Sequence, residues 1–463
     1  MTSKANVVGG ISAKKQGKCR TSLSPGRASL AVVLAAVALT LGLLTTVDAQ
    51  AATPKTVYVS QTGLNSGGCT VTAPCATVSY ALTKATSGGT IKVSGTIDDH
   101  LVISAPVTVT PWVGGPAGSS AVLNGTFTTF DSVVEVASGV SGVTLEDLTI
   151  ENGYDTNGGG ILNNGTLTLT DSTVSGNGNS SDLGGGIYNG GTMTITDSTI
   201  ANNTAEDGGG IFNVGTMTIL ASTISANTCT GTSSGCSSGG IYSGNGHTAV
   251  LGATIAADNT GGNCDGYDTS SLSSVGFNLT NDTTGTACAF TALDLVNKSP
   301  LLGPLASNGG PTQTMLPALT SPAADVIHDP TTLEGVAVCP GTDQRGVIRP
   351  GQGETGCTIG AVEVGATSPT TTSVSLLPAT TVTSGTTVAY VVTVVPTAGT
   401  GTPTGKVTFK IGKVVLCKAV LSGGVAACGA TSAPVGVDTV TGTYSGGGDF
   451  AGSAGTATLA VTS

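Results

Sequence analysis

The chain has 463 residues and a formal net charge of −11. This acidic balance argues against nucleic acid and against an anionic membrane surface as partners. It fits a soluble, exported protein rich in threonine and glycine.

The amino-terminal 51 residues have the features of an export signal. Six basic residues come before the apolar run 28–47, and no acidic residue precedes Asp48. This order, followed by the small-residue sequence Ala49 to Ala51, predicts a secretory signal peptide over residues 1–51. The alternative is a retained membrane anchor, which we disfavour because no other long apolar run exists; no membrane span is expected after cleavage. The mature chain then has ten Lys and Arg against 26 Asp and Glu.

The mature chain opens with one strand and one helix. Residues 57–60 alternate polar and apolar side chains, whereas residues 75–85 place apolar side chains at helical spacing. The segment 56–97 resembles the start of pectate-lyase-like proteins, and the resemblance implies a right-handed parallel β-helix. The helix is then expected to cover the open end of that solenoid and to keep other chains from its edge.

Residues 143–248 repeat one pattern four times. Glycine triplets begin at Gly158, Gly184 and Gly208, and a shortened copy begins at Gly239. A period in the twenties is the signature of a solenoid, in which each coil buries its apolar side chains against its neighbours. Each copy has three short strand-like segments, so we predict an all-β fold with a parallel β-helix over residues 52–262.

The repeated glycines and asparagines have structural explanations. The glycines suit corners that need positive φ and close backbone approach. Two sets of asparagines follow the second and third strands of each coil, and we expect them to form hydrogen-bonded ladders; they are Asn177, Asn203 and Asn227, then Asn163, Asn189 and Asn213. The Gly-Gly-Gly-Ile copies also resemble the repeats of polymorphic outer membrane proteins, a resemblance that implies fold and carries little about activity.

Ten of the eleven cysteines lie beyond the signal and fall into close pairs. In an exported protein these predict local disulfides. The pairs are Cys69 with Cys75, Cys229 with Cys236, Cys264 with Cys288, Cys339 with Cys357, and Cys417 with Cys428. The metal-site alternative is weak, because no Cys-x-x-Cys occurs and His100, His247 and His328 lie far apart in the chain.

No cofactor is expected, and structural calcium is the alternative. The acidic stretch from Asp265 to Asp268 could hold that ion. It lacks the dense spacing of a dedicated calcium loop.

Residues 263–365 lose the repeat and resemble the closing region of choice-of-anchor Q proteins. The matching clusters are residues 308–312, 321–325, 343–346, 349–350 and 359–363. This resemblance implies a location at the cell surface more than a chemistry.

The two arginines of the mature chain lie in that region. Arg345 and Arg349 are close in sequence to Asp343 and Glu363. We expect a charge-assisted cluster that locks the last coil. The alternative is that the two arginines bind a substrate.

The carboxy-terminal part predicts a separate domain. Residues 366–375 are expected to be a polar linker, and seven strand-like segments over the following residues 376–463 predict an antiparallel β-sandwich. The phrase at residues 401–409, with Tyr444 to Gly446, resembles bacterial Ig-like repeats. Such domains space or present other modules on cell surfaces.

A catalytic role for the solenoid has one candidate. A uronate lyase needs a strong base, yet no Lys or Arg occurs between Lys92 and Lys298. A hydrolase needs two carboxyl groups, and Asp147, Asp171 and Asp197 hold equivalent places in successive coils. Coils stack about 4.8 Å apart, near the about 5–5.5 Å of a retaining pair. The alternative is a turn role, since Ala221 follows in the next coil.

A binding role has one candidate surface. Aromatic residues recur beside the glycines and are expected either to form an exposed stripe or to pack at the corners; they are Tyr154, Tyr188, Phe212 and Tyr242.

The sequence therefore predicts a secreted, surface-associated bacterial protein that is non-enzymatic and adhesin-like or structural. Its expected partner is a polysaccharide or a host or cell-surface component. The alternative is a polysaccharide hydrolase acting through the stacked aspartates.

Overall fold

A computed structural model describes residues 55–463, except 119, 127–130, 179–182, 232–235, 237, 268–270, 284–286, 329–331, 334–335, 351–354, 366–369, 398–401 and 448–449. The predicted signal peptide, residues 1–51, lies outside the described residues. Within the described ranges, no helix is both long and apolar enough to cross a membrane.

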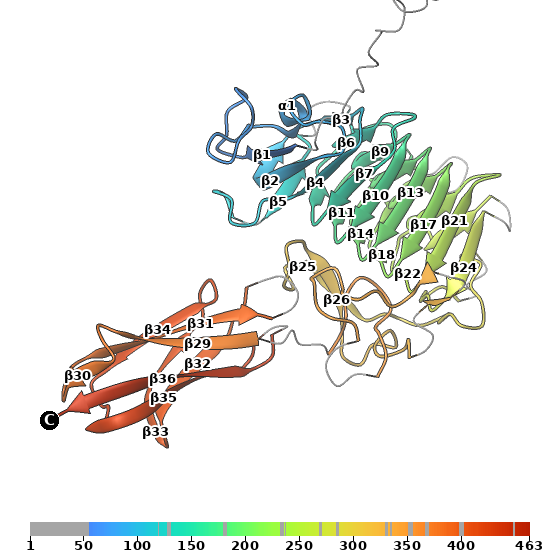
Figure 1. Cartoon of the computed structure of the whole chain (residues 1–463). Helices are drawn as coiled ribbons and strands as arrows, with labels where there is room; N and C mark the ends of the chain where they lie inside the picture. Colours follow the sequence, from blue (N-terminus) through green and yellow to red (C-terminus); the bar gives the residue numbers. More distant parts are fainter. Residues whose placement is uncertain are drawn as a thin grey trace, which may run out of the picture. The chain divides into compact units, whose positions relative to one another are not determined.

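The first part of the chain is a parallel β-helix with three faces (Figure 1). Face 1 contains β1 (Thr56–Ser60), β2 (Gly89–Asp98), β4 (Val107–Pro111), β7 (Val143–Glu146), β10 (Thr166–Thr170), β13 (Thr192–Thr196), β17 (Thr216–Leu220), β21 (Thr248–Gly252) and β24 (Leu272–Gly276). The end of β2 continues into face 2, with β5 (Ala121–Asn124), β8 (Thr149–Glu151), β11 (Thr173–Ser175), β14 (Thr199–Ala201), β18 (Thr223–Ser225) and β22 (Ile255–Ala257).

Face 3 completes each coil and contains β3 (Leu101–Ile103), β6 (Val134–Val136), β9 (Ile161–Asn163), β12 (Ile187–Asn189), β16 (Ile211–Asn213), β20 (Ile241–Ser243) and β23 (Cys264–Gly266). Two short strands, β15 (Thr204–Ala205) and β19 (Thr228–Cys229), pair beside it. Three strands per coil confirm the fold predicted from the repeats.

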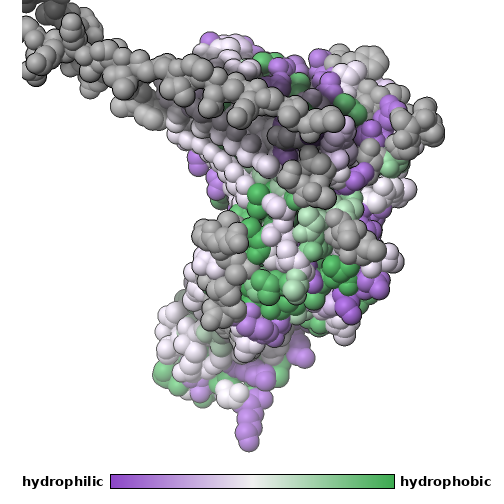
Figure 2. Space-filling model, turned by 90° about the vertical axis from the view of Figure 1, so that its right-hand side faces the viewer, coloured by the Kyte–Doolittle hydropathy of each residue, from purple (hydrophilic) through white to green (hydrophobic). Residues whose placement is uncertain are grey.

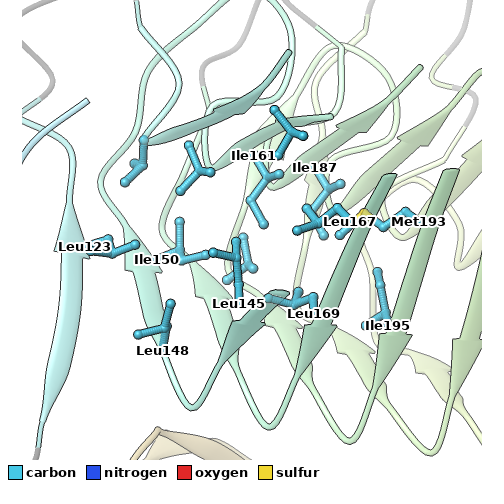
Figure 3. Packing of buried hydrophobic residues seen from close by; sticks show 14 of the residues in the cluster. Leu123, Leu145, Leu148, Ile150, Ile161, Leu167, Leu169, Ile187, Met193 and Ile195 are labelled. Carbon is cyan, nitrogen blue, oxygen red and sulfur yellow. The ribbon is translucent and has the colours of Figure 1, made fainter. Parts of the chain in front are cut away.

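Apolar side chains of successive coils stack in columns inside the β-helix. Leu145, Leu169 and Ile195 hold the same register on face 1, and all three are fully buried (Figure 3). Burying one such side chain contributes about 1.5–3 kcal/mol. The period-two alternation therefore stabilises the solenoid one coil at a time.

Both predicted asparagine ladders are present and buried. Asn163 donates to Asn189 at 2.7 Å, and Asn189 donates to Asn213 at 2.8 Å. The second ladder runs from Asn177 through Asn203 and Asn227 with side-chain bonds of 3.0 Å, then continues to Asn259 and Asn263. Each amide also bonds to backbone groups at the corners. These bonds satisfy backbone N–H and C=O groups that have no partner within the sheets.

The glycine triplets have the predicted geometry. The first glycine of each triplet has positive φ, 69° at Gly158, 65° at Gly184 and 60° at Gly208. A Cβ on the second glycine, Gly185, would clash with the carbonyl oxygen of Thr204 in the next coil. Larger residues are therefore excluded from these corners.

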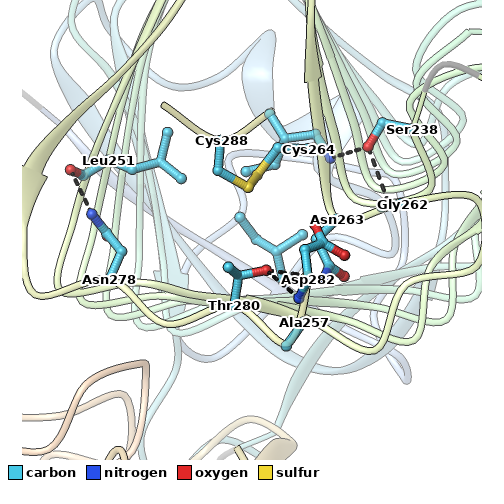
Figure 4. Close-up of a disulfide and its surroundings, with 12 residues drawn as sticks. Ser238, Leu251, Ala257, Gly262, Asn263, Cys264, Asn278, Thr280, Asp282 and Cys288 are labelled. Atoms are coloured by element: carbon cyan, nitrogen blue, oxygen red, sulfur yellow. Dashed lines mark hydrogen bonds between the residues drawn. A yellow bond between two sulfur atoms is a disulfide. The ribbon is translucent and has the colours of Figure 1, made fainter. Parts of the chain in front are cut away.

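Each end of the β-helix is covered. The helix α1 (Val78–Leu82) packs against β1, β2 and β3 and buries Val78 and Ala81. At the other end, the disulfide between Cys264 and Cys288 lies across the interior of the last coils (Figure 4). Both cysteines belong to the apolar core.

The β-helix is longer than predicted. Strands β23 and β24 pair with the coil before them, and parallel bridges join Ile255 to Leu279 and Leu279 to Leu295. The boundary predicted at residue 262 is therefore too early, because the coil continues after the glycine signature ends. We call residues 298–365 the closing segment.

The closing segment has little regular structure. It contains β25 (Leu302–Ala306), β26 (Thr314–Pro317), β27 (Thr332–Leu333) and β28 (Val336–Ala337), in two antiparallel pairs. Its Ala323, Ile327 and Ile359 share an apolar cluster with Ala253 and Ile255 of the β-helix. Figure 2 shows the molecule from the side on which β24 lies in Figure 1. In that view, apolar residues form a patch on part of the surface.

The carboxy-terminal domain is an antiparallel sandwich of two sheets. One sheet contains β29 (Thr370–Leu377), β31 (Val388–Pro396) and β34 (Val425–Ala430). The other contains β30 (Thr381–Thr383), β32 (Lys406–Ile411), β33 (Val414–Val420), β35 (Gly436–Tyr444) and β36 (Ser453–Thr462). Strand β29 begins inside the predicted linker 366–375, because its alternating threonines already pair with β31.

All five predicted disulfide pairs are present. The pair Cys417–Cys428 joins β33 to β34 and so links the two sheets of the sandwich. The other four lie in the β-helix and the closing segment.

Candidate functional site

The stacked aspartates occupy the corner between face 1 and face 2. Asp147, Asp171 and Asp197 have φ of 56°, 50° and 46°. The same left-handed conformation continues in the later coils at Ala221 and Ala253. Asp tolerates this conformation better than most residues, because its short polar side chain bonds locally. The geometry of the corner is thus one reason for the repeat.

The closing segment covers face 2 next to this corner. The Gln344 amide donates to the carbonyl oxygen of Ser172 and to the hydroxyl of Thr173, and its oxygen accepts from Thr199 at 2.6 Å. The backbone N–H of Ala361 donates to the Thr223 hydroxyl at 3.1 Å. The outward threonines of β11, β14 and β18 therefore have partners from the closing segment.

The third aspartate of the column pairs with the closing segment. Arg349 Nη2 lies 3.2 Å from Asp197 Oδ1, and Arg349 Nη1 lies 3.5 Å from Glu363 Oε2. The three side chains are 1%, 7% and 0% exposed. Arg349 also donates to the carbonyl oxygens of Thr358 and Gly360. The cluster therefore reaches a coil in the middle of the repeats, and the prediction that it locks the last coil was wrong.

Arg345 forms the second half of the cluster. Its guanidinium lies 2.8 Å from Asp343, and both side chains are buried. Asp343 also accepts from the backbone N–H groups of Val347 and Glu363. With both guanidinium groups buried among protein acceptors, the geometry supports a structural role for the arginines rather than substrate binding.

Burial and negative neighbours raise the pKa values of the column. Burial, with the nearby charges of Asp197 and Asp147, raises the pKa of Asp171 to about 8. Burial and Glu146 raise the pKa of Asp147 to about 6. Burial also raises the pKa of Asp197, against the opposing effect of the Arg349 guanidinium. Burial is the largest cause for all three groups, because surroundings poor in water disfavour the charged carboxylate.

Three of the four aromatic residues stack on one another in successive coils of face 3. The rings of Tyr188 and Phe212 stack with centroids 5.7 Å apart, and those of Phe212 and Tyr242 with centroids 4.8 Å apart. Phe212 is only 9% exposed. Because the rings stack on one another, their faces are covered by the neighbouring rings. A sugar ring would need a free aromatic face to stack on.

Tyr154 lies apart from the stripe. Leu162 holds the position in register with Tyr188, whereas Tyr154 bridges to Asp131 at a corner. The prediction that Tyr154 belongs to the stripe was wrong, because the first copy of the repeat places its aromatic residue before the glycines and not after them.

Tyr154 instead lines a cavity of about 190 Å³ at the corner between faces 2 and 3 in the first coils, which the sequence did not predict. Other residues lining it are Asp98, His100, Asp131 and Ser132. His100 Nδ1 lies 2.5 Å from the carbonyl oxygen of Ser132, so this nitrogen carries the proton and donates.

No group of three or more His, Cys, Asp or Glu side chains that could hold a metal ion occurs among the residues that the structure describes. Asp265 lies on β23, and burial raises its pKa. Asp268, the other end of the predicted calcium stretch, lies outside the described residues.

Comparisons with known proteins give a family match for the carboxy-terminal domain and one similar solved structure. Residues 374–462 match the family model of the bacterial Ig-like domain (group 3). A solved structure, that of the pectate lyase Pel9A, is similar with 16% identity and a TM-score of 0.33, over 67% of this chain and 96% of that one. No curated protein matches the chain.

The chain is thus an all-β protein with a parallel β-helix followed by an Ig-like domain. Its disulfides and its bacterial Ig-like domain fit an extracellular protein.

Proposed function

We propose that this is an exported, surface-associated bacterial protein with a non-enzymatic, adhesin-like or structural role. The β-helix is a stiff acidic module, and the Ig-like domain is a spacer that presents it. The proposal rests on one observation above all: Asp197, a member of the only stacked carboxyl column that the sequence singled out, is paired with Arg349 of the closing segment.

A carboxyl group in that position is poorly placed for hydrolysis. Asp197 is 5% exposed as a residue and its partner Arg349 is also buried. A general acid or nucleophile must reach the glycosidic bond of a bound sugar. A buried ion pair under a closing segment instead fixes the position of that segment.

The second candidate is a polysaccharide hydrolase that uses Asp147 and Asp171. Their pKa values, raised to about 6 and about 8, favour it. Carboxyl groups that keep a proton near neutral pH are suited to general acid catalysis.

Release of products from polysaccharides discriminates the two candidates. Purified residues 52–463 would be incubated with plant, fungal and bacterial polysaccharides, with calcium and with chelator, and new reducing ends and co-sedimentation would be measured. We expect binding without new reducing ends, and the same binding by the Asp171→Asn protein. Reducing ends that appear with the native chain and disappear with Asp171→Asn, but not with the control Asp282→Asn, would establish the hydrolase.

A further inference from the structure

Face 1 carries threonines in two straight ranks across its outer surface. Strand registers place one threonine of each of seven successive strands side by side, namely Thr56, Thr90, Thr108, Thr144, Thr168, Thr194 and Thr218. A second rank, which is exposed, lies two residues earlier in four successive coils and contains Thr166, Thr192, Thr216 and Thr248. Figure 1 shows the strands of this face lying side by side.

The two ranks form a grid with regular spacing in both directions. Neighbouring strands lie about 4.8 Å apart, and residues i and i+2 of one strand about 6.6 Å apart. Threonine is branched at Cβ, so few rotamers are open to it, and equal backbone geometry in each coil favours equal rotamers. Hydroxyl and methyl groups therefore repeat as fixed rows and not as independent side chains.

This grid differs from the threonines of face 2, which bond to the closing segment. Among the described residues, no protein group bonds to the hydroxyls of Thr144, Thr168 or Thr194, so water must satisfy them. The face is also nearly uncharged, in a chain of net charge −11. The outward charged residues of the described face 1 strands are Lys92 and Glu146.

We infer that face 1 is an ice-binding surface. A hydroxyl anchors a water molecule as both donor and acceptor, and the neighbouring methyl restricts the orientation of the water beside it. Rows at these two spacings hold waters close to the positions that they take in an ice lattice. An ice surface is uncharged and periodic in two dimensions. Face 1 is nearly uncharged and has the same kind of periodicity, so the two surfaces match. Because the rows are rigid, little ordering entropy is lost when they meet the crystal.

The surface does not depend on the proposed function, since both a scaffold and an enzyme could carry it. A soluble polysaccharide is a poorer fit, because the aromatic pair Tyr58–Trp112 lies only at the β1 end of face 1 and the face has almost no charged group. A second copy of the chain is also a poorer fit, because a rank of exposed hydroxyls would have to be desolvated against an identical rank.

Partition into a slowly growing ice crystal tests the inference. Purified residues 52–463 would be mixed with a labelled globular protein that ice excludes, and the ice fraction and recrystallisation inhibition would be measured. We expect the native chain to be enriched in the ice, and the double variant Thr168→Tyr, Thr194→Tyr to be excluded. Thr439→Tyr, at an exposed position of β35, is the matched control and should keep ice binding.

A second pair of substitutions covers a folding defect in the tyrosine variant. Thr168→Ser with Thr194→Ser keeps the hydroxyls and removes two methyl groups, and we expect weakened ice binding with an unchanged thermal midpoint. Exclusion of the native chain from ice overturns the inference, and so does full ice binding by a folded Thr168→Tyr, Thr194→Tyr protein. Exclusion from ice combined with binding to crystalline cellulose or chitin overturns it in favour of a polysaccharide surface.

Discussion

Faces 1 and 2 of the β-helix both carry an outward threonine in four successive coils and use it differently. In one coil, Thr194 on β13 faces outward from face 1, and Thr199 on β14 faces outward from face 2. Thr194 is half-buried, and no protein group among the described residues bonds to its hydroxyl, whereas Thr199 is fully buried and donates to Gln344 at 2.6 Å. A buried hydroxyl needs such a partner, and an exposed one does not. The role of a repeated residue therefore depends on what covers it, which the repeat itself does not encode.

The largest expected effect breaks the contact that holds the cover on face 2. Arg349→Met leaves Asp197 and Glu363 buried without their cation. Removing one partner of a buried pair costs about 3–5 kcal/mol. Chemical unfolding should show a loss of that size, whereas Lys298→Met, at an exposed position of the closing segment, should leave stability within error. An unchanged unfolding midpoint for Arg349→Met would contradict the role of the pair.

The asparagine ladder should come next. Asn203 bonds to Asn177, Asn227 and the carbonyl oxygen of Val174, all buried. Asn203→Ala leaves at least two of those groups unsatisfied, at about 1–3 kcal/mol each. Thermal unfolding should show this loss, and Asn164→Ala, at an exposed asparagine after β9, is the control. Equal stability of the two variants would count against the ladder.

The threonine comparison can be tested within one coil by the isosteric change to valine. Thr199→Val removes the donor to Gln344 and should cost about 1–2 kcal/mol. Thr194→Val should stay within about 0.5 kcal/mol, as surface substitutions do. Equal costs at the two positions, measured by chemical unfolding, would show that the closing segment does not cover face 2 in solution.

The smallest expected effect concerns pH. The pKa of Asp171 is raised from 3.8 to about 8, so the folded chain binds this proton more tightly than the unfolded chain does. That contribution to stability is complete below about pH 4 and is lost as the pH rises towards 8. We rank it last because the carboxyl is only partly buried and water screens it. Asp171→Asn should flatten the fall of unfolding free energy across this range, whereas Asp282→Asn should not; parallel profiles would contradict the assignment.

The sequence was sufficient for whatever recurs from coil to coil. The period gave the three-strand coil, the apolar columns such as Leu169 and Ile195, both asparagine ladders and the disulfide pairs of close cysteines. These features depend on residues one coil apart or closer, so their spacing carries the information.

The rest of the site depends on contacts between distant segments. Arg349 and Asp197 are 152 residues apart, and no periodicity links them. The sequence predicted the partners Asp343 and Glu363 because they lie close to the arginines, but it could not show which coil the closing segment contacts. The alternating sequence of β10 and β11 likewise does not say which outward face is covered.

A double-mutant cycle between Asp197 and Arg349 tests the central claim most directly, namely that the third aspartate of the column fastens the closing segment. Unfolding free energies would be measured for the native chain, Asp197→Asn, Arg349→Met and the double variant. The account predicts a coupling of about 0.5–3 kcal/mol, as for residues in direct contact. Additive losses would contradict it, because they would show that Asp197 and Arg349 do not interact in the folded protein.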